Sequence, residues 1–249
     1  MMNILLMVSY DGTNYHGWQR QNGQITVQEC LENALSQLYK EEITVRGSSR
    51  TDTGVHCKGQ GALYKTDKNI PVDRLPYAVN AFLPDDIVIN GAYGVDDSFH
   101  PQYSVIDKTY EYKILNAKFR DPMLINYTEF IKYPLNADKM KAACPHFCGE
   151  HDFKAFCASG SDAKTTVRTI YELNVAKNGE IISITVRGSG FLYNMVRIIA
   201  GTLAYVGLGK IQPDDIPGII SSLDRTKAGK TLSPNGLTLL EVNYEKIDR

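Results

Sequence analysis

The 249-residue sequence has no apolar run approaching the roughly 18 to 20 residues that a membrane-spanning helix needs. Its apolar start, Met1–Tyr10, lacks a basic leader and a small-residue cleavage site, so we expect no signal peptide there. The five cysteines are odd in number and irregularly spaced, which is atypical of a disulfide framework. Together these absences favour a protein of a reducing, cytoplasmic compartment.

An excess of charge of either sign is also missing. The 27 Lys and Arg residues nearly balance the 28 Asp and Glu residues, whereas a dedicated nucleic-acid binder usually carries a basic excess. The total does not exclude a basic face, because basic residues cluster in two parts of the sequence: Arg46, Arg50, Lys58 and Lys65 in the first, and Lys164, Arg168, Arg187 and Arg197 in the second. The charge therefore leaves RNA binding open.

Several catalytic signatures are absent as well. There is no Walker loop and no dinucleotide fingerprint, and Gly207-Leu208-Gly209 fits a helix C-cap better than a phosphate loop. A zinc site usually needs closely spaced ligand pairs on two elements, and the sequence offers one cluster only. We interpret that cluster as buried or incidental residues rather than a metal centre: Cys144, His146, Cys148, His151 and Cys157.

What the sequence does contain is an alternation of strand and helix patterns. In the first half we expect strands at 3–10, 43–47, 59–66 and 86–95 and helices at 26–38 and 73–82. Thr26 and Glu29 have the spacing of a capping box. In the second half we expect strands at 108–116, 167–176, 181–188 and 237–244, with helices at 138–147, at 191–206 and after Pro213. Asn178-Gly179 predicts a hairpin turn.

Each half therefore reads β-α-β-β-α-β, which is the order of a ferredoxin-like, split βαβ unit. We predict an α+β protein with two such halves in tandem, residues 1–105 and 106–249, whose antiparallel sheets join side by side. A cleft between two such halves would be a natural place for a site.

The loop Gly47–His56 is the strongest candidate for chemistry. It places Asp52, Arg50 and several hydroxyl residues between two predicted strands, and loops held by a rigid scaffold often carry catalytic groups. The Arg50 charge would help to keep Asp52 ionised. The same composition also suits an ordinary surface turn, so composition alone does not decide.

Two features of the second half bear on this choice. Arg197 lies among Met, Val and Ile on a predicted core helix, so it needs a partner such as Asp52, unless its stem packs on the helix while its head reaches water. Tyr110 and Tyr112 alternate along a strand and share one face, where they could stack on a base or simply fill the core. The residues leave both alternatives open.

The loop 50–56 with Gly59-Gln60 resembles the signature of the tRNA pseudouridine synthase A family. Further stretches resemble that family in its own order across nearly the whole chain: residues 10–12, 15–21, 27–28, 82–84, 108–112, 149–153, 167–170 and 191–201. The resemblance implies two ferredoxin-like halves, a homodimer, tRNA as partner, and no metal or cofactor.

The resemblance also implies a reaction and a role for each matching residue. The reaction is isomerisation of uridine to pseudouridine at positions 38 to 40 of the tRNA anticodon stem-loop. Asp52 would act on a flipped-out uridine as nucleophile or base. The remaining expected roles are base displacement and RNA binding for Arg50, stacking on the uracil for Tyr110, pairing with the aspartate for Arg197, an apolar pocket wall for Leu237, and phosphate contacts for Lys58 and Arg168.

The sequence departs from the family pattern at a few positions. It has Thr53 where Ala is usual, Ser49 where Gly is usual, and Phe99-His100-Pro101-Gln102 in place of Phe-His-Ala-Arg. Leu63 replaces a usual His, and residues 230–234 differ from the common Thr-Ala-Pro form. None of these changes removes the implied chemistry, but they make altered RNA targets an alternative.

Two other classes of function remain as alternatives. Ferredoxin-like sheets commonly bind RNA without catalysis through exposed aromatic residues, although no Gly-Phe-x-Phe strand of that kind is visible. A metal hydrolase built on the Cys/His cluster is the weaker of the two.

Overall fold

The computed structural model describes residues 2–245 and 247. The chain divides into two compact units, which are described separately here: unit 1 runs to Ile106 and also takes in the chain from Thr238, and unit 2 is Asp107–Leu237. The last strand, which the sequence analysis assigned to the second half, begins at Leu237 in unit 2 and continues from Thr238 in unit 1. Its partner lies far away in sequence, and no local pattern of residues identifies such a partner.

Unit 1 is built on a sheet in which β1 (Met2–Tyr10) is flanked by two antiparallel neighbours, β3 (His56–Thr66) and β4 (Ile87–Val95). The short β2 (Arg46–Gly47) pairs with β3, and β10 (Leu237–Tyr244) joins β3 in parallel at Thr238 and Leu239. The order β4-β1-β3 with β2 outside β3 is that of a split βαβ unit.

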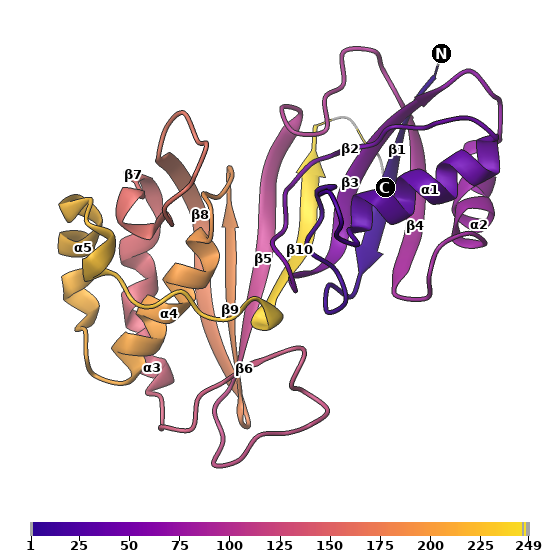
Figure 1. Cartoon of the computed structure of the whole chain (residues 1–249). Helices are drawn as coiled ribbons and strands as arrows, with labels where there is room; N and C mark the ends of the chain where they lie inside the picture. The colour runs from indigo at the N-terminus through magenta and orange to yellow at the C-terminus, as the bar shows by residue number, and fades with distance from the viewer. Residues whose placement is uncertain (1, 246, 248–249) are drawn as a thin grey trace. The chain divides into compact units, whose positions relative to one another are not determined.

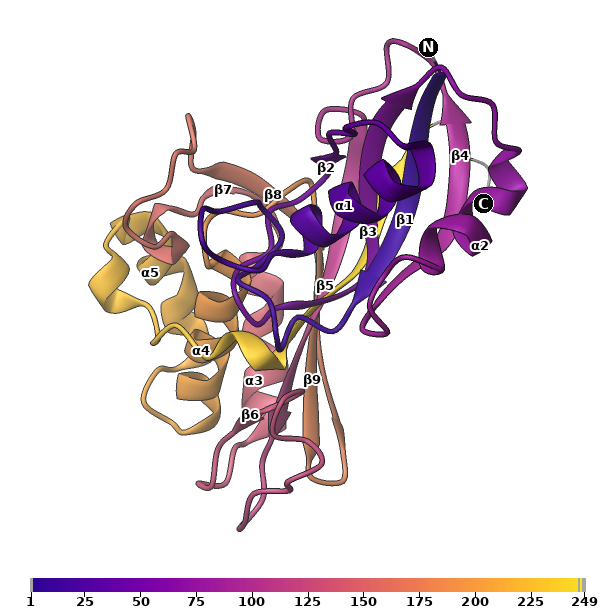
Figure 2. The same ribbon diagram turned by 45° about the vertical axis from the view of Figure 1, so that its right-hand side comes forward.

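Helices α1 (Val27–Tyr39) and α2 (Leu75–Asn80) lie against this sheet in unit 1 (Figures 1 and 2). The Thr26 hydroxyl accepts a hydrogen bond from the Glu29 backbone N–H, which confirms the predicted cap. The buried face of α1 holds Val27, Leu31, Ala34 and Leu35, as the helical spacing predicts. The expected strand at 43–47 is shorter than predicted, since only Arg46–Gly47 forms a ladder.

Unit 2 contains the strand order β5-β9-β8-β7, from β5 (Val105–Leu115), β9 (Ile181–Gly188), β8 (Val167–Asn178) and β7 (Gly149–Asp152). All three pairings are antiparallel, and β8 and β9 form the predicted hairpin. The short β6 (Glu129–Phe130) pairs with β5 in parallel. Neither β6 nor β7 is predicted from the sequence, because each is too short to show a period.

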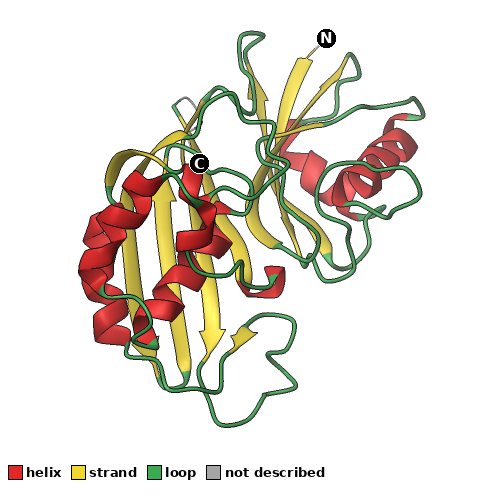
Figure 3. Cartoon of the chain, turned by 60° about the vertical axis from the view of Figure 1, so that its left-hand side comes forward, coloured by secondary structure: helices red, strands yellow, loops and turns green. Residues whose placement is uncertain are grey.

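Figure 3 shows helices of unit 2 packed in front of its strands. They are α3 (Ala137–Ala143), α4 (Met195–Gly207) and α5 (Ile216–Ser222). Asn136 caps α3 as predicted, by accepting from the Lys139 N–H at 2.9 Å. The core side chains include Tyr112, Phe147, Phe153 and Ile198, all fully buried. The α+β class is confirmed. Among the described residues no helix has the length and hydropathy that a membrane crossing requires.

Candidate active site

Asp52 lies on the loop that connects β2 to β3 in unit 1, so strands begin or end on both sides of it. The side chains of Thr51 and Val55 are buried, whereas Asp52 is half-buried and Thr53 is exposed. The loop thus leaves Asp52 partly exposed, while buried side chains on both sides of it hold the loop in place. Three other segments of unit 1 supply the anchors.

The first anchor is the end of β1. The buried Tyr10 hydroxyl and the Thr51 hydroxyl lie 2.7 Å apart and share a hydrogen bond. Two residues later, the Gly12 N–H donates to His56 Nδ1 at 3.1 Å. A Cβ at Gly12 would stand 2.0 Å from the Val55 carbonyl oxygen, so this close approach of two backbones requires glycine.

The second anchor is the loop that precedes α1. The Trp18 N–H donates to the Thr51 carbonyl at 3.1 Å, and the Gly54 N–H donates to the Tyr15 carbonyl at 3.3 Å. Gly17 has φ +82°, and a Cβ there would lie 2.5 Å from the Thr51 oxygen. The backbone on both sides of Asp52 is therefore bonded to this loop.

The third anchor is Gln60, which is fully buried in the middle of β3. Its side-chain N–H donates to the Ser49 carbonyl at 2.6 Å, and its side-chain oxygen accepts from the Ser48 hydroxyl at 3.2 Å. The Ser48 hydroxyl in turn accepts from the Gly61 N–H. A single amide thus fixes the entry of the loop.

Arg50 and Lys58, the two predicted RNA contacts of unit 1, are both exposed. The Arg50 guanidinium forms no ion pair or hydrogen bond within the described residues, so the suggested support of Asp52 by a neighbouring Arg50 is not a direct contact. Its charge is available to an anionic ligand instead.

In unit 2, Tyr110 and Tyr112 share a face of β5 but have different surroundings. Tyr112 is fully buried and donates its hydroxyl hydrogen to the Ser233 carbonyl at 2.7 Å, and burial raises its pKa. That is a core role. Tyr110 is 8% exposed and packs edge-to-face on Phe191, with ring centroids 5.2 Å apart and planes at 84°. The contact fixes the plane of the Tyr110 ring.

Arg197 lies in the first turn of α4 and is half-buried. Its Nε–H donates to the Leu232 carbonyl at 2.7 Å, and its Nη1 donates to the Asn194 side-chain oxygen at 2.6 Å. These bonds fix the orientation of the guanidinium, which excludes a head that moves freely in water. The sequence had left this choice open.

The remaining predicted contacts of unit 2 are Leu237 and Arg168. Leu237 is buried at the start of β10. Arg168, on β8, donates through Nη1 to the carbonyls of Thr165 and Val167. Burial, together with the nearby Arg168 charge, lowers the pKa of Lys108 to about 8. The sequence analysis did not predict this proximity of Lys108 to Arg168, because the register that aligns β5 with β9 and β8 is a tertiary feature.

The structure also places the cysteines and histidines of the 144–157 cluster. All five cysteines are free, and no group of three or more His, Cys, Asp or Glu residues within the described part of the chain could hold a metal ion. Cys144 is buried with its thiol directed at the Met140 carbonyl, and burial raises its pKa to about 12.

Comparison with known proteins gives a consistent result. The model of a family described as tRNA pseudouridine synthase matches residues 6–104 and 143–245. A tRNA pseudouridine synthase A from Thermoanaerobacter sp. (strain X514) is 53% identical over 244 residues, covering 98% of this chain and 100% of the relative. Proteins of the same name from Caldicellulosiruptor bescii and Ruminiclostridium cellulolyticum are 50% and 51% identical, with the same coverage.

Among solved structures, a chain from a Cbf5-Nop10-Gar1 complex aligns with a TM-score of 0.36 and 13% identity, over 94% of this chain and 57% of that one. That likeness is too remote to support an argument. The family match spans most of the sequence, and the relatives match it from end to end. This chain belongs to the tRNA pseudouridine synthase family.

Proposed function

We propose that this pseudouridine synthase acts on uridines at positions 38 to 40 of the tRNA anticodon stem-loop, with Asp52 as its reacting carboxylate. The observation that carries the proposal is the immobilised Asp52 loop, which is bonded to three other segments of unit 1 while Asp52 itself is half-buried. Preorganised positioning of this kind can contribute about 7 kcal/mol or more to lowering a barrier. A surface turn without function would not need such support.

The reaction keeps every heavy atom of the nucleotide and exchanges one proton with solvent. The bond between uracil N1 and sugar C1′ breaks, the uracil turns, and a new bond forms from C5 to C1′. The proton on C5 leaves to solvent, and N1 takes up a proton. A carboxylate can assist by attacking either uracil C6 or sugar C1′, because both routes divide one difficult step into two easier ones.

In this proposal the other site residues act on the same uridine. Tyr110 stacks on the uracil, Leu237 forms an apolar wall, and Arg197 is the charge partner of the aspartate. The fixed ring plane of Tyr110 and the fixed guanidinium of Arg197 support these roles. Arg50 helps to displace the base, and Lys58 and Arg168 contact phosphates, which position the RNA without reading its sequence.

We further propose that the enzyme works as a homodimer in the cytoplasm and needs no metal or cofactor. Light scattering of the purified protein at micromolar concentration tests the first point, with a mass of about twice the 27.8 kDa chain expected. Activity that persists after exhaustive treatment with a chelator tests the last.

The deciding experiment maps pseudouridine in unmodified tRNA transcripts treated with the wild-type enzyme. We expect modification confined to positions 38 to 40. Modification at other positions would refute the assignment of the target positions but would leave the proposed reaction standing. Tight binding of tRNA without any pseudouridine would favour the RNA-binding alternative and overturn the proposal.

A further inference from the structure

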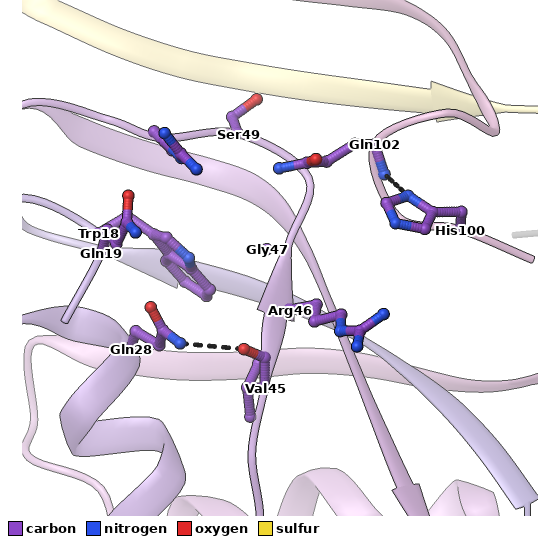
Figure 4. Close-up of a pocket in the computed structure, with 10 residues that line it drawn as sticks. Trp18, Gln19, Gln28, Val45, Arg46, Gly47, Ser49, His100 and Gln102 are labelled. Carbon is purple, nitrogen blue, oxygen red and sulfur yellow. Dashed lines mark hydrogen bonds between the residues drawn. The ribbon is translucent and has the colours of Figure 1, made fainter. Parts of the chain in front are cut away.

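A pocket of about 280 Å³ lies in unit 1, lined in part by the residues that precede Asp52 in the chain (Figure 4). Its lining combines the segment that leads into the Asp52 loop with a turn that follows β4: Trp18, Gln19, Gln28, Val45, Arg46, Gly47, Ser49, Arg50, His100 and Gln102. The volume is near the lower end of the range for small-molecule sites. The sequence analysis assigned no pocket here.

The floor of the pocket is formed by Trp18 and Gln28, whose side chains already contact other residues of the protein. Trp18 is 2% exposed, and its ring lies so close to Gly47 that a Cβ on that residue would stand 2.3 Å from the indole nitrogen. The Gln28 amide donates to the Val45 carbonyl at 3.0 Å and to Glu32. Because these side chains are already in contact with other residues, the floor has little free apolar surface against which a side chain of a protein partner could pack.

The rim of the pocket consists of exposed polar side chains that have no hydrogen-bonding partner in the part of the chain that the structure describes: Gln19, Arg46, Arg50 and Gln102. Within the described residues, the guanidinium groups of Arg46 and Arg50 form no ion pair or hydrogen bond, and neither do the side-chain amides of Gln19 and Gln102. No carboxylate is among the ten lining residues. Figure 4 shows the Gln102 amide extending toward the segment that holds Gly47 and Ser49. Two positive charges without a neutralising partner favour an anionic ligand.

His100 adds a donor to the same rim. Its Nδ1 accepts hydrogen bonds from the backbone N–H groups of Gln102 and Tyr103, and its ring stacks on Tyr103 with centroids 4.3 Å apart. Because Nδ1 is an acceptor, the proton of the neutral ring is on Nε2, which leaves an N–H donor. Amides and this imidazole can bond the edge of a nucleobase, while the arginines suit a phosphate.

Position along the chain identifies the source of that nucleotide. Arg50 stands two residues before Asp52, so their Cα atoms are at most about 7 Å apart, which is comparable to one nucleotide step of an unstacked strand. An RNA strand whose uridine reaches Asp52 thus brings its neighbouring nucleotide to the pocket. We propose that this pocket binds the nucleotide next to the target uridine, with Arg46 and Arg50 on its phosphate and Gln19 and Gln102 on its base edge. The inference rests on the proposed function.

The single tryptophan gives a direct reporter of the pocket, because Trp18 is the only one in the chain. When an anticodon stem-loop RNA is titrated into the protein, the Trp18 fluorescence should change and then reach a plateau at saturation. Arg46→Gln should weaken the Kd about tenfold and lower the slope of log K against log salt by about 0.7, the value for one lost contact to a single-stranded phosphate. Arg74→Gln, at an exposed arginine paired with Asp73 outside the pocket, is the matched control and should change neither.

Kinetics test the phosphate contact through Arg46 and the base contact through Gln102. Arg46→Gln should raise KM about tenfold and leave kcat within about twofold. Wild-type enzyme should prefer some bases at the nucleotide beside the target, and Gln102→Leu should flatten that preference while the salt slope stays unchanged. A merely structural role of Gln102 would not alter a preference among bases.

The two proposals fail differently. If the wild-type enzyme makes pseudouridine normally while Arg46→Gln has an unchanged Kd and salt slope, the pocket proposal is wrong and the proposed function stands. If no pseudouridine forms, the proposed function fails, and the assignment of the pocket to the nucleotide beside a target fails with it. A Trp18 response to uridine monophosphate but none to the stem-loop would indicate a site for free nucleotides and also overturn the inference.

Discussion

The Asp52 loop of unit 1 and the Arg197 side chain of unit 2 are both immobilised, but by different groups. Asp52 depends on the backbone around it, which is bonded to the end of β1, to the loop before α1 and to Gln60. Arg197 is on a helix, and its own side chain makes the fixing bonds, to Leu232 and Asn194. A short side chain on a loop is positioned through its backbone, whereas a long one needs bonds at its tip.

The comparison predicts that, among changes to the groups that support Asp52 and Arg197, backbone changes near the loop have the largest effect. Gly17→Ala places a Cβ 2.5 Å from the Thr51 oxygen at a φ of +82°, so the two loops must move apart. We expect pseudouridine formation to fall about 100-fold, since a misplacement of about 1 Å can have that effect. Gly23→Ala is the matched control, because Gly23 has φ +73° and open space around it. Equal losses in both variants would show that the contact with Thr51 is irrelevant.

A smaller effect is expected when the tip of Arg197 loses one bond. Asn194→Gly removes the oxygen that accepts from Arg197 Nη1 and suits the local φ of +59°. Because the Leu232 bond remains, kcat should fall about tenfold with little change in the melting temperature. Steady-state kinetics and thermal unfolding measure the two effects, and an unchanged kcat would argue that Asn194 does not position the guanidinium.

Removal of one hydrogen bond from the first anchor should have a milder effect still. Tyr10→Phe deletes the hydroxyl that is bonded to Thr51, which should lower the free energy of unfolding by about 1 kcal/mol and activity a few-fold. Tyr39→Phe breaks a comparable buried bond to Tyr64 elsewhere in unit 1. It should reduce stability similarly without affecting the rate. If both variants lose activity to the same extent, the anchor has no special role.

A last prediction concerns pH-dependent stability through Lys108. Its pKa is about 8 in the folded protein and 10.5 in an unperturbed side chain. Between these values the unfolded chain binds more protons, so the free energy of unfolding should gain from this residue as pH rises from about 8 to about 10. Chemical denaturation should show a shallower rise for Lys108→Met than for wild type or Lys177→Met, an exposed control on β8. Identical slopes would refute the lowered pKa.

Local patterns in the sequence predicted much of the fold. The cap at Thr26, the buried face of α1, the cap at Asn136 and the hairpin of β8 with β9 all follow from residues close together in the chain. What local patterns could not predict is pairing over long separations. The return of β10 to unit 1 and the short β6 and β7 depend on contacts that no period reveals.

The candidate site shows the same limit. The composition of its loop identified Asp52 as a candidate. The sequence did not show why residues 12 and 17 are glycines, because the close approach of Gly12 to Val55 and of Gly17 to Thr51 is a tertiary contact. Tyr110 and Tyr112 are equivalent in the sequence pattern, and only packing distinguishes them. Two departures from the family pattern, Ser49 and Gln102, are far apart in sequence but line one pocket.

The most direct test of the central claim is release of tritium from tRNA labelled at uridine C5, measured in a single turnover with wild type, Asp52→Asn and Asp73→Asn. Asp73 is an exposed carboxylate of unit 1 outside the loop. We predict that Asp52→Asn folds and binds tRNA like wild type but releases tritium at least about 1,000-fold more slowly, whereas Asp73→Asn is unaffected. Release by Asp52→Asn at a rate near that of wild type would contradict the account.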